Sequence, residues 1–400
     1  MNAVKRYFTR CFEISHGKHT GLPGMEGLRG FAVFLVFLTH YFSLSEPWLT
    51  QDSIAHFVGH SLWRIGNTGV DLFFVLSGYM IYGMLIAKPR PMIPYFRRRI
   101  ERIYPTFLVV LFIYVALSMA VPNKSLLPAE MWGAAVYLAQ NLLMLPGLFQ
   151  IKPIITVAWS LSYEFFYYLV IPFLIIALRM RSWPRYARIV FFAIIAIGIF
   201  AYALTFQHHV RLMMFVAGIL LFESPTFRAA GLIDRIGLVA PLAVFLAING
   251  SDDGGGLWRY VWLFFAFYLL CYAVFREERF TYRIFTWTPL RWLGNMSYSY
   301  YLIHGLTLNV AFVALAKLFP PSGQAPWIYW VAMVPMFAFT LIPSTILFLA
   351  IERPYSIQPR LQSPRPRNNP IAAEFATQRG FVGNAIHADD VSPRKNHLEE

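Results

Sequence analysis

The sequence contains few charged residues and few cysteines. Charged residues make up 14% of the 400 residues and hydrophobic residues 58%, a balance that excludes an ordinary soluble domain. The two cysteines, Cys11 in a polar leader and Cys271 in an apolar run, exclude a disulfide framework. A Walker loop, a dinucleotide-binding fingerprint and a His-Glu-x-x-His motif are all missing, so NTP hydrolysis, hydride transfer and metalloprotease chemistry lack support and no metal is expected. We therefore predict a polytopic membrane protein.

Long apolar stretches alternate with basic connections along the chain. Each stretch is close to the length that crosses about 30 Å of hydrocarbon. Lys and Arg accumulate in the leader, at 88–102, 179–188 and 276–291, and after 352, which places both termini in the cytoplasm. We expect an all-α, polytopic transmembrane helix bundle of about ten spans. The predicted spans are 28–46, 63–86, 103–121, 159–178, 187–205, 210–222, 236–250, 258–275, 296–318 and 328–351.

One further apolar stretch, 131–149, is not counted as a span. A crossing there would place two basic clusters that both belong in the cytoplasm on opposite sides of the membrane. The stretch is interrupted at Gln140-Asn141 and at Pro146-Gly147. Irregular backbone at membrane depth needs surrounding protein or a water-filled cavity, so these interruptions predict a re-entrant or interfacial segment.

The chain divides into three expected regions. Residues 1–27 form a cytoplasmic leader without a cleavable signal peptide, and 28–352 form the membrane domain. Residues 353–400 are polar and rich in Pro and Arg, which predicts a disordered cytoplasmic tail. The formal net charge of +14 comes from basic clusters at helix ends, so the expected partner is the lipid bilayer and not nucleic acid.

Ionisable residues inside the predicted spans point to function. Arg29 and His40 are eleven residues apart, so on one helix they share a face and lie roughly 16 Å apart along the axis. Asp71 reaches about the same depth from the outer side, and a buried carboxylate needs a partner. We expect Asp71 to pair with His40, as an acidic group that orients a histidine base.

Three further residues are candidates for the substrate site. Glu164 lies about 7 Å below the outer end of its span and is expected to face an outer vestibule. His304 lies eight residues from the inner end of its span, where packing, helix-to-helix hydrogen bonding and substrate contact all remain open. Trp159 is typical of an interfacial aromatic anchor, and stacking on a sugar is the alternative.

A run of arginines precedes the third span. Positive-inside anchoring explains the cluster by charge count alone. However, Arg99 and Arg102 are three residues apart and therefore neighbours on a helix, with Arg98 beside them. Guanidinium groups bind phosphate oxygens in a bidentate way, so this run is also a candidate site for a phosphate-bearing donor.

These groups together form a path across the membrane, and two functions fit it. One is transfer of a group to a hydroxyl activated by His40. The other is a proton-coupled transporter for a sugar or anionic solute, in which His40, Asp71 and Glu164 relay protons.

Five motifs occur in order along the chain: EGLRG (26–30) with His40, GVDLFFVLSG (69–78), RIERIYP (99–105), WSLSYE (159–164) and SYSYYLIH (297–304). In order and spacing they resemble the acyltransferase type 3 family of bacterial integral membrane O-acyltransferases. The resemblance covers about residues 24–355, and Glu26 stands where the family more often has Asp. We expect the stand-alone form, without a periplasmic esterase-like domain.

The resemblance implies O-acylation, commonly O-acetylation from cytoplasmic acetyl-CoA, of a glycan, lipid-linked saccharide or other hydroxyl acceptor at the bacterial inner membrane. It also implies that Arg29 and His40 are important and that Arg99 and Arg102 serve the acyl-CoA co-substrate. Our hypothesis is that the arginines, Arg98 among them, hold the donor phosphates. His40 then acts as general base or carries the acyl group, while Glu164, Trp159 and His304 contact the acceptor.

Overall fold

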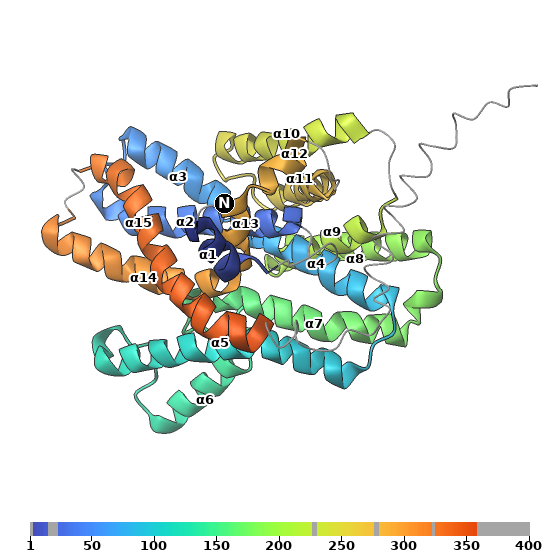
Figure 1. The fold of residues 1–400 in the computed structure, drawn as a ribbon, viewed down its shortest axis with the longest axis horizontal. Coiled ribbons are helices and arrows are strands. Elements are labelled where there is room, and N and C mark those ends of the chain that lie inside the picture. Colours follow the sequence, from blue (N-terminus) through green and yellow to red (C-terminus); the bar gives the residue numbers. More distant parts are fainter. Residues whose placement is uncertain (1–2, 15–22, 226–229, 276–279, 322–324, 358–400) are drawn as a thin grey trace, which may run out of the picture.

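The computed structural model describes residues 3–14, 23–225, 230–275, 280–321 and 325–357. Fifteen α-helices run through these residues, and Figure 1 shows them as one bundle. The expected all-α polytopic bundle is confirmed. The helices are α1 (Ala3–Phe12), α2 (Pro23–Ser45), α3 (Ile54–Gly66), α4 (Gly69–Ala87), α5 (Met92–Ala120), α6 (Met131–Leu142), α7 (Trp159–Ala177), α8 (Arg185–Phe206), α9 (Met213–Glu223), α10 (Ala230–Gly250), α11 (Trp258–Val274), α12 (Phe280–Phe285), α13 (Thr288–Asn295), α14 (Ser297–Leu318) and α15 (Trp327–Leu347).

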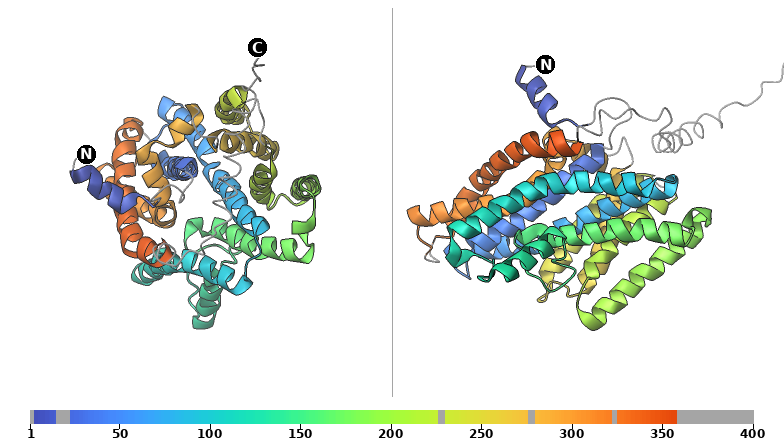
Figure 2. Two further views of the ribbon diagram at one scale, coloured as in Figure 1. Left: turned by 45° about the vertical axis from the view of Figure 1, so that its right-hand side comes forward. Right: turned by 90° about the horizontal axis from the view of Figure 1, so that it is seen from below.

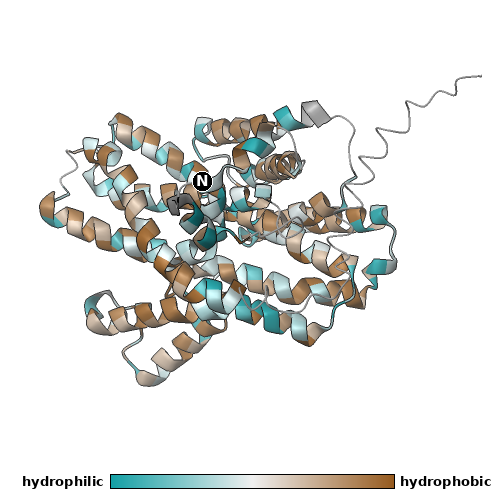
Figure 3. Cartoon of the chain, viewed as in Figure 1, coloured by the Kyte–Doolittle hydropathy of each residue, from teal (hydrophilic) through white to brown (hydrophobic). Residues whose placement is uncertain are grey.

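Seven helical segments in the described residues are long and apolar enough to cross a membrane. Figure 3 shows hydrophobic residues along most of the length of the outlying helices α5, α6 and α14. Each of the ten predicted spans overlaps a helix of the structure, although α9 and α11 have only 11 and 17 residues. The chain is a multi-pass membrane protein.

The second predicted span is two helices that meet at a bend. The chain becomes helical at Ile54, nine residues earlier than predicted, and α3 ends at Gly66 before α4 begins at Gly69. The Thr68 hydroxyl donates to the Ile65 carbonyl oxygen at 2.7 Å, a local bond that competes with a continuous helix. The bend lets both helices pack against α2.

The helix α2 lies near the middle of the bundle (Figure 2, left) and contacts helices from most of the chain. Two glycines allow its closest contacts. A Cβ atom on Gly27 would lie 1.6 Å from the Phe285 carbonyl oxygen, and one on Gly30 would lie 2.0 Å from the Leu290 carbonyl oxygen. Helices α12 and α13 therefore pack directly on the α2 backbone on either side of Arg29, which fixes the height of its side chain.

The stretch 131–149 begins as the short helix α6 and then turns irregular. Met144 and Gly147 both have positive φ, and a Cβ on Gly147 would lie 2.5 Å from the Trp159 carbonyl oxygen. The backbone thus breaks next to the predicted Pro146-Gly147 interruption.

Both ends of the membrane domain differ in detail from the expected regions. The leader contains the helix α1, which the sequence did not indicate. After α15 the chain continues as the π-helix η6 (Phe348–Ile357), five residues into the expected tail. Residues 358–400 of that tail lie outside the described residues.

Candidate active site

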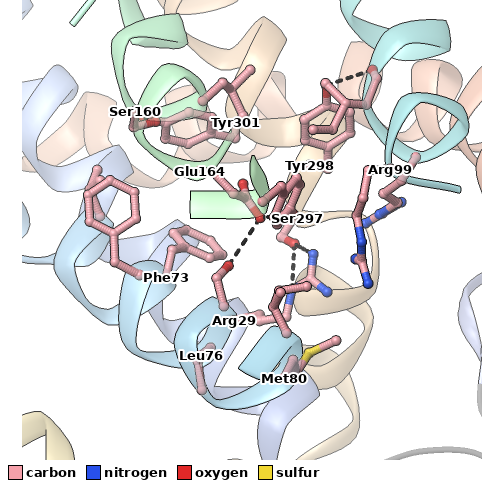
Figure 4. Close-up of a pocket in the computed structure, with 18 of the residues that line it drawn as sticks. Arg29, Phe73, Leu76, Met80, Arg99, Ser160, Glu164, Ser297, Tyr298 and Tyr301 are labelled. Atoms are coloured by element: carbon pink, nitrogen blue, oxygen red, sulfur yellow. Dashed lines mark hydrogen bonds between the residues drawn. The ribbon is translucent and has the colours of Figure 1, made fainter. Parts of the chain in front are cut away.

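A cavity of about 290 Å³ lies among α2, α4, α5, α7, α13, α14 and η6. Its polar lining includes Arg29, Arg99, Arg102 and Glu164, and its apolar lining includes Phe73, Leu76 and Met80, drawn in Figure 4. The charged groups come from α2, α5 and α7, which are far apart in the sequence. The structure therefore brings four of the predicted site residues into one chamber.

Arg29 reaches this cavity from α2 and is held by α14. Its Nε and Nη2 atoms donate to the Ser297 hydroxyl oxygen at 3.2 Å and 2.9 Å. Figure 4 shows Arg29, Ser297 and Glu164 pointing toward one another inside the cavity. The neutral serine leaves the charge of Arg29 available to an anion.

Arg99 lies between two aromatic rings that leave part of its guanidinium unused. Its guanidinium carbon is 5.2 Å from the ring centroid of Tyr95 and 5.1 Å from that of Tyr168. The Nε atom is buried without a hydrogen-bond partner in the described part of the chain. An unsatisfied buried donor on a cavity wall is a natural binding point for an anionic oxygen.

Arg102 is the third arginine of the cavity, and a carboxylate compensates its charge. Its Nη1 atom lies 2.5 Å from Glu352, which is fully buried in η6 and also accepts from the Ser299 hydroxyl at 2.7 Å. Arg98, by contrast, is exposed on α5. The predicted arginine run thus contributes two side chains to the cavity.

A fourth arginine lies close to the arginine run of α5. Arg90 lies in the connection between α4 and α5. Burial lowers the pKa of Arg90, and repulsion by Arg98 and Arg99 lowers it further. Like charges are therefore gathered at this end of α5.

Glu164 shares the chamber with the arginines. The sequence placed it in an outer vestibule, but Ser77 on α4 donates to Glu164 Oε1 at 3.1 Å and Tyr168, one turn along α7, donates to the same oxygen. The carboxylate balances part of the positive charge. Because two hydroxyls fix it, Glu164 sits at one defined position in the cavity wall.

His40 lies next to His304. Their ring centroids are 5.0 Å apart, and His304 is fully buried while His40 is half-buried. Tyr301 lines the cavity, and its ring centroid lies 6.0 Å from that of His304. The histidine pair therefore lies next to the chamber wall, with Tyr301 in contact with both the chamber and His304.

The predicted pair of Asp71 with His40 is wrong. The partner of Asp71 is Arg211, whose Nη1 lies 3.2 Å from Asp71 Oδ2. The guanidinium of Arg211 also packs over Trp159 and Tyr260, at 5.4 Å and 5.5 Å from their ring centroids. Trp159 thus covers an ion pair, and Asp71 is only 1% exposed.

Sequence reasoning missed three groups that shape these clusters. Arg211 is a charged residue inside the predicted span 210–222, and Glu352 directly precedes the polar tail. Both carried the signal of an ionisable residue in or beside a span. Ser297 begins the motif SYSYYLIH (297–304), but its residue type did not indicate contact with Arg29. A metal-binding group of three or more His, Cys, Asp or Glu is absent from the described residues.

Comparison with known proteins identifies relatives of the chain. A family described as Acyltransferase domain matches residues 22–349. The O-acetyltransferase OatA of Staphylococcus aureus (strain NCTC 8325 / PS 47) is 26% identical over 331 residues, which cover 72% of this chain and 52% of that protein. A putative O-acetyltransferase of S. aureus (strain COL) is 24% identical over 335 residues, covering 73% of this chain and 53% of that protein. The chain spans about half the length of these two relatives. No solved structure matches.

Proposed function

The chain belongs to the acyltransferase family, and from that premise we propose that it moves an acyl group, in the first instance acetyl, from cytoplasmic acyl-CoA to a hydroxyl of a glycan or related acceptor. The observation that carries the proposal is the chamber in which Arg29, Arg99 and Arg102 face Glu164 among apolar side chains. In this proposal the protein lies in the bacterial inner membrane with both termini in the cytoplasm.

The chamber fits the reactive arm of the donor. Its volume of about 290 Å³ is at the lower end for small-molecule sites, so it suits an acyl-pantetheine arm and the phosphates next to it, while the adenosine stays outside. Arg99 has an unused donor, and Arg29 is bound only to a neutral hydroxyl among the contacts described for it. Both supply hydrogen bonds to phosphate oxygens. Arg98, exposed on the same helix as Arg99, adds to the attraction for phosphate.

His40 is the proposed general base. In direct transfer it takes the proton of the acceptor hydroxyl, the oxygen forms an ester bond with the acyl carbon, the C–S bond of the thioester breaks, and the proton passes to the departing thiolate. A transient acyl group on His40 gives the same products. Glu164 and Trp159 stay as proposed acceptor contacts, while Asp71 is committed to Arg211.

Mass spectrometry of surface glycans and lipids tests this function. Cells carrying the wild type are compared with cells carrying His40→Ala, cells carrying His208→Ala and cells without the protein. His208 is exposed, so it serves as a histidine control. We expect an acyl mass increment with the wild type and with His208→Ala, and none with His40→Ala or without the protein. Identical spectra in all four, together with uptake of a solute by the wild type, would replace the proposal with transport.

A further inference from the structure

His304 has no surface with which to touch a substrate, and this sets it apart from His40. Its exposed fraction is 0%, and the Tyr300 ring stacks on it with an interplanar angle of 10° and a centroid distance of 5.2 Å. The His40 ring packs against it at an angle of 64°. Contact of His304 with an acceptor, one of the roles expected from the sequence, is therefore excluded in this arrangement.

Hydrogen bonds to the backbone fix the tautomer of His304. Its Nδ1 atom lies 2.8 Å from the Tyr301 carbonyl oxygen and 3.0 Å from the Tyr300 carbonyl oxygen. Carbonyl oxygens only accept, so Nδ1 carries the proton, and Nε2 of the neutral ring presents a lone pair. This Nε2 is buried and has no hydrogen-bond partner in the described residues. A buried acceptor without a donor is unusual in a native core.

His40 is the candidate for that donor because its ring packs against His304, although no hydrogen bond joins the two rings in the described residues. Asp71, the acidic orienter expected for His40, is paired with Arg211 instead. The ring of His304 is the ionisable neighbour that packs against His40. An imidazole acts as a base with one nitrogen only while its other nitrogen carries a proton, and a hydrogen bond to that N–H selects the tautomer.

We infer that His304 is the positioning residue of His40: its Nε2 accepts the N–H of His40 as His40 takes the proton of the acceptor hydroxyl. This inference rests on the proposed function. His304 gains and loses no proton; it orients the His40 ring and stabilises its cationic form. The ester bond forms and the thioester bond breaks as in the direct transfer described above.

Two substitutions of His304 test the hydrogen-bond acceptor at Nε2 and the hydrogen-bond donor at Nδ1 separately. A glutamine amide reaches the position of Nε2, so His304→Gln keeps an acceptor there. The shorter His304→Asn keeps only the N–H toward the carbonyl oxygens of Tyr300 and Tyr301. His304→Leu removes both. The initial rate of acetyl transfer to the extracted glycan is measured per mole of folded protein, at saturating acetyl-CoA, together with the KM for acetyl-CoA and the melting temperature.

We expect these variants to differ in the rate of acetyl transfer. We expect His304→Gln to keep the rate within about tenfold of the wild type, and His304→Asn and His304→Leu to lose at least about a hundredfold, with the KM for acetyl-CoA within about twofold. Wild-type rates in His304→Asn, or equal losses in Gln and Leu variants that melt like the wild type, would overturn it. His40→Ala runs in parallel, and full activity there would refute the proposed base itself, a failure distinct from that of His304.

Discussion

The arginine-lined cavity and the Asp71–Arg211 pair both hold buried charged groups, and they differ in what lies opposite each charge. In the cavity, Arg29 is held by a neutral serine, and Arg99 has a buried Nε without a partner in the described residues. At the pair, Arg211 is bound by Asp71 Oδ2 and by the Asn67 carbonyl oxygen and packs against two aromatic rings, while Asp71 Oδ1 is buried without a hydrogen-bond partner in the same residues.

The difference shows that an ionisable residue in a span predicts a partner more reliably than it predicts chemistry. Removing a charge from water is costly, so each buried charge needs compensation. Where another charge and close packing supply it, as at Asp71, we expect the group to stabilise the fold. Where open volume remains beside it, as at Arg99, we propose that an external anion supplies it. The following variants test this division.

Breaking the pair has the largest expected effect, on stability. Asp71→Leu leaves Arg211 uncompensated, which costs about 3–5 kcal/mol in the free energy of unfolding. Thermal melting in lipid nanodiscs measures the loss. The double variant Asp71→Leu, Arg211→Leu removes both charges and recovers most of the stability. A single variant that melts at the wild-type temperature would show that the pair does not stabilise the fold.

The cavity arginine affects donor binding and not the fold. Arg99→Ala removes a charged hydrogen-bond donor worth about 1.5–3 kcal/mol, so we expect the KM for acetyl-CoA to rise about 10- to 100-fold. Steady-state release of the CoA thiol measures it. Arg98→Ala on the same helix is the control and should change KM less than about threefold. Equal effects of the two substitutions would mean that only the overall charge of the run matters.

Glu164, the carboxylate of the cavity, is expected to weaken the binding of acetyl-CoA, whereas the arginines strengthen it. Glu164→Gln keeps an oxygen for Ser77 and Tyr168 but removes a negative charge from the chamber. Acetyl-CoA should therefore bind equally well or more tightly, while transfer slows about tenfold because an acceptor contact is weakened. Binding and transfer rates are measured separately. Weaker donor binding in this variant would contradict the assignment of Glu164 to the acceptor.

Removing the hydrogen-bond partner of Arg29, Ser297, has the smallest expected effect on donor binding. Ser297→Ala removes one neutral acceptor, worth about 1 kcal/mol, so the KM for acetyl-CoA should rise about fivefold. Ser43→Ala, on the exposed face of α2, is the matched control and should leave KM unchanged. An unchanged KM in Ser297→Ala would show that Arg29 needs no anchor on α14.

The sequence predicted the helices better than it predicted the partners of the polar groups. Length and hydropathy locate a span, and the rise per residue gives only the expected depth of a side chain such as His40 or Asp71. Depth does not determine which neighbouring helix a side chain meets. Asp71 therefore meets Arg211 across the bundle, and Glu164 meets the arginines. The bend at Thr68 escaped prediction because it depends on the close packing of α3 and α4 on α2.

Direct binding of acetyl-CoA to the purified protein in lipid nanodiscs tests the central claim that the arginine-lined chamber is the donor site. Calorimetry compares the wild type, Arg99→Ala and the double variant Asp71→Leu, Arg211→Leu. The account predicts equal dissociation constants for the wild type and the double variant, and at least about tenfold weaker binding by Arg99→Ala. Equal binding by all three proteins, or no binding by the wild type, would contradict it.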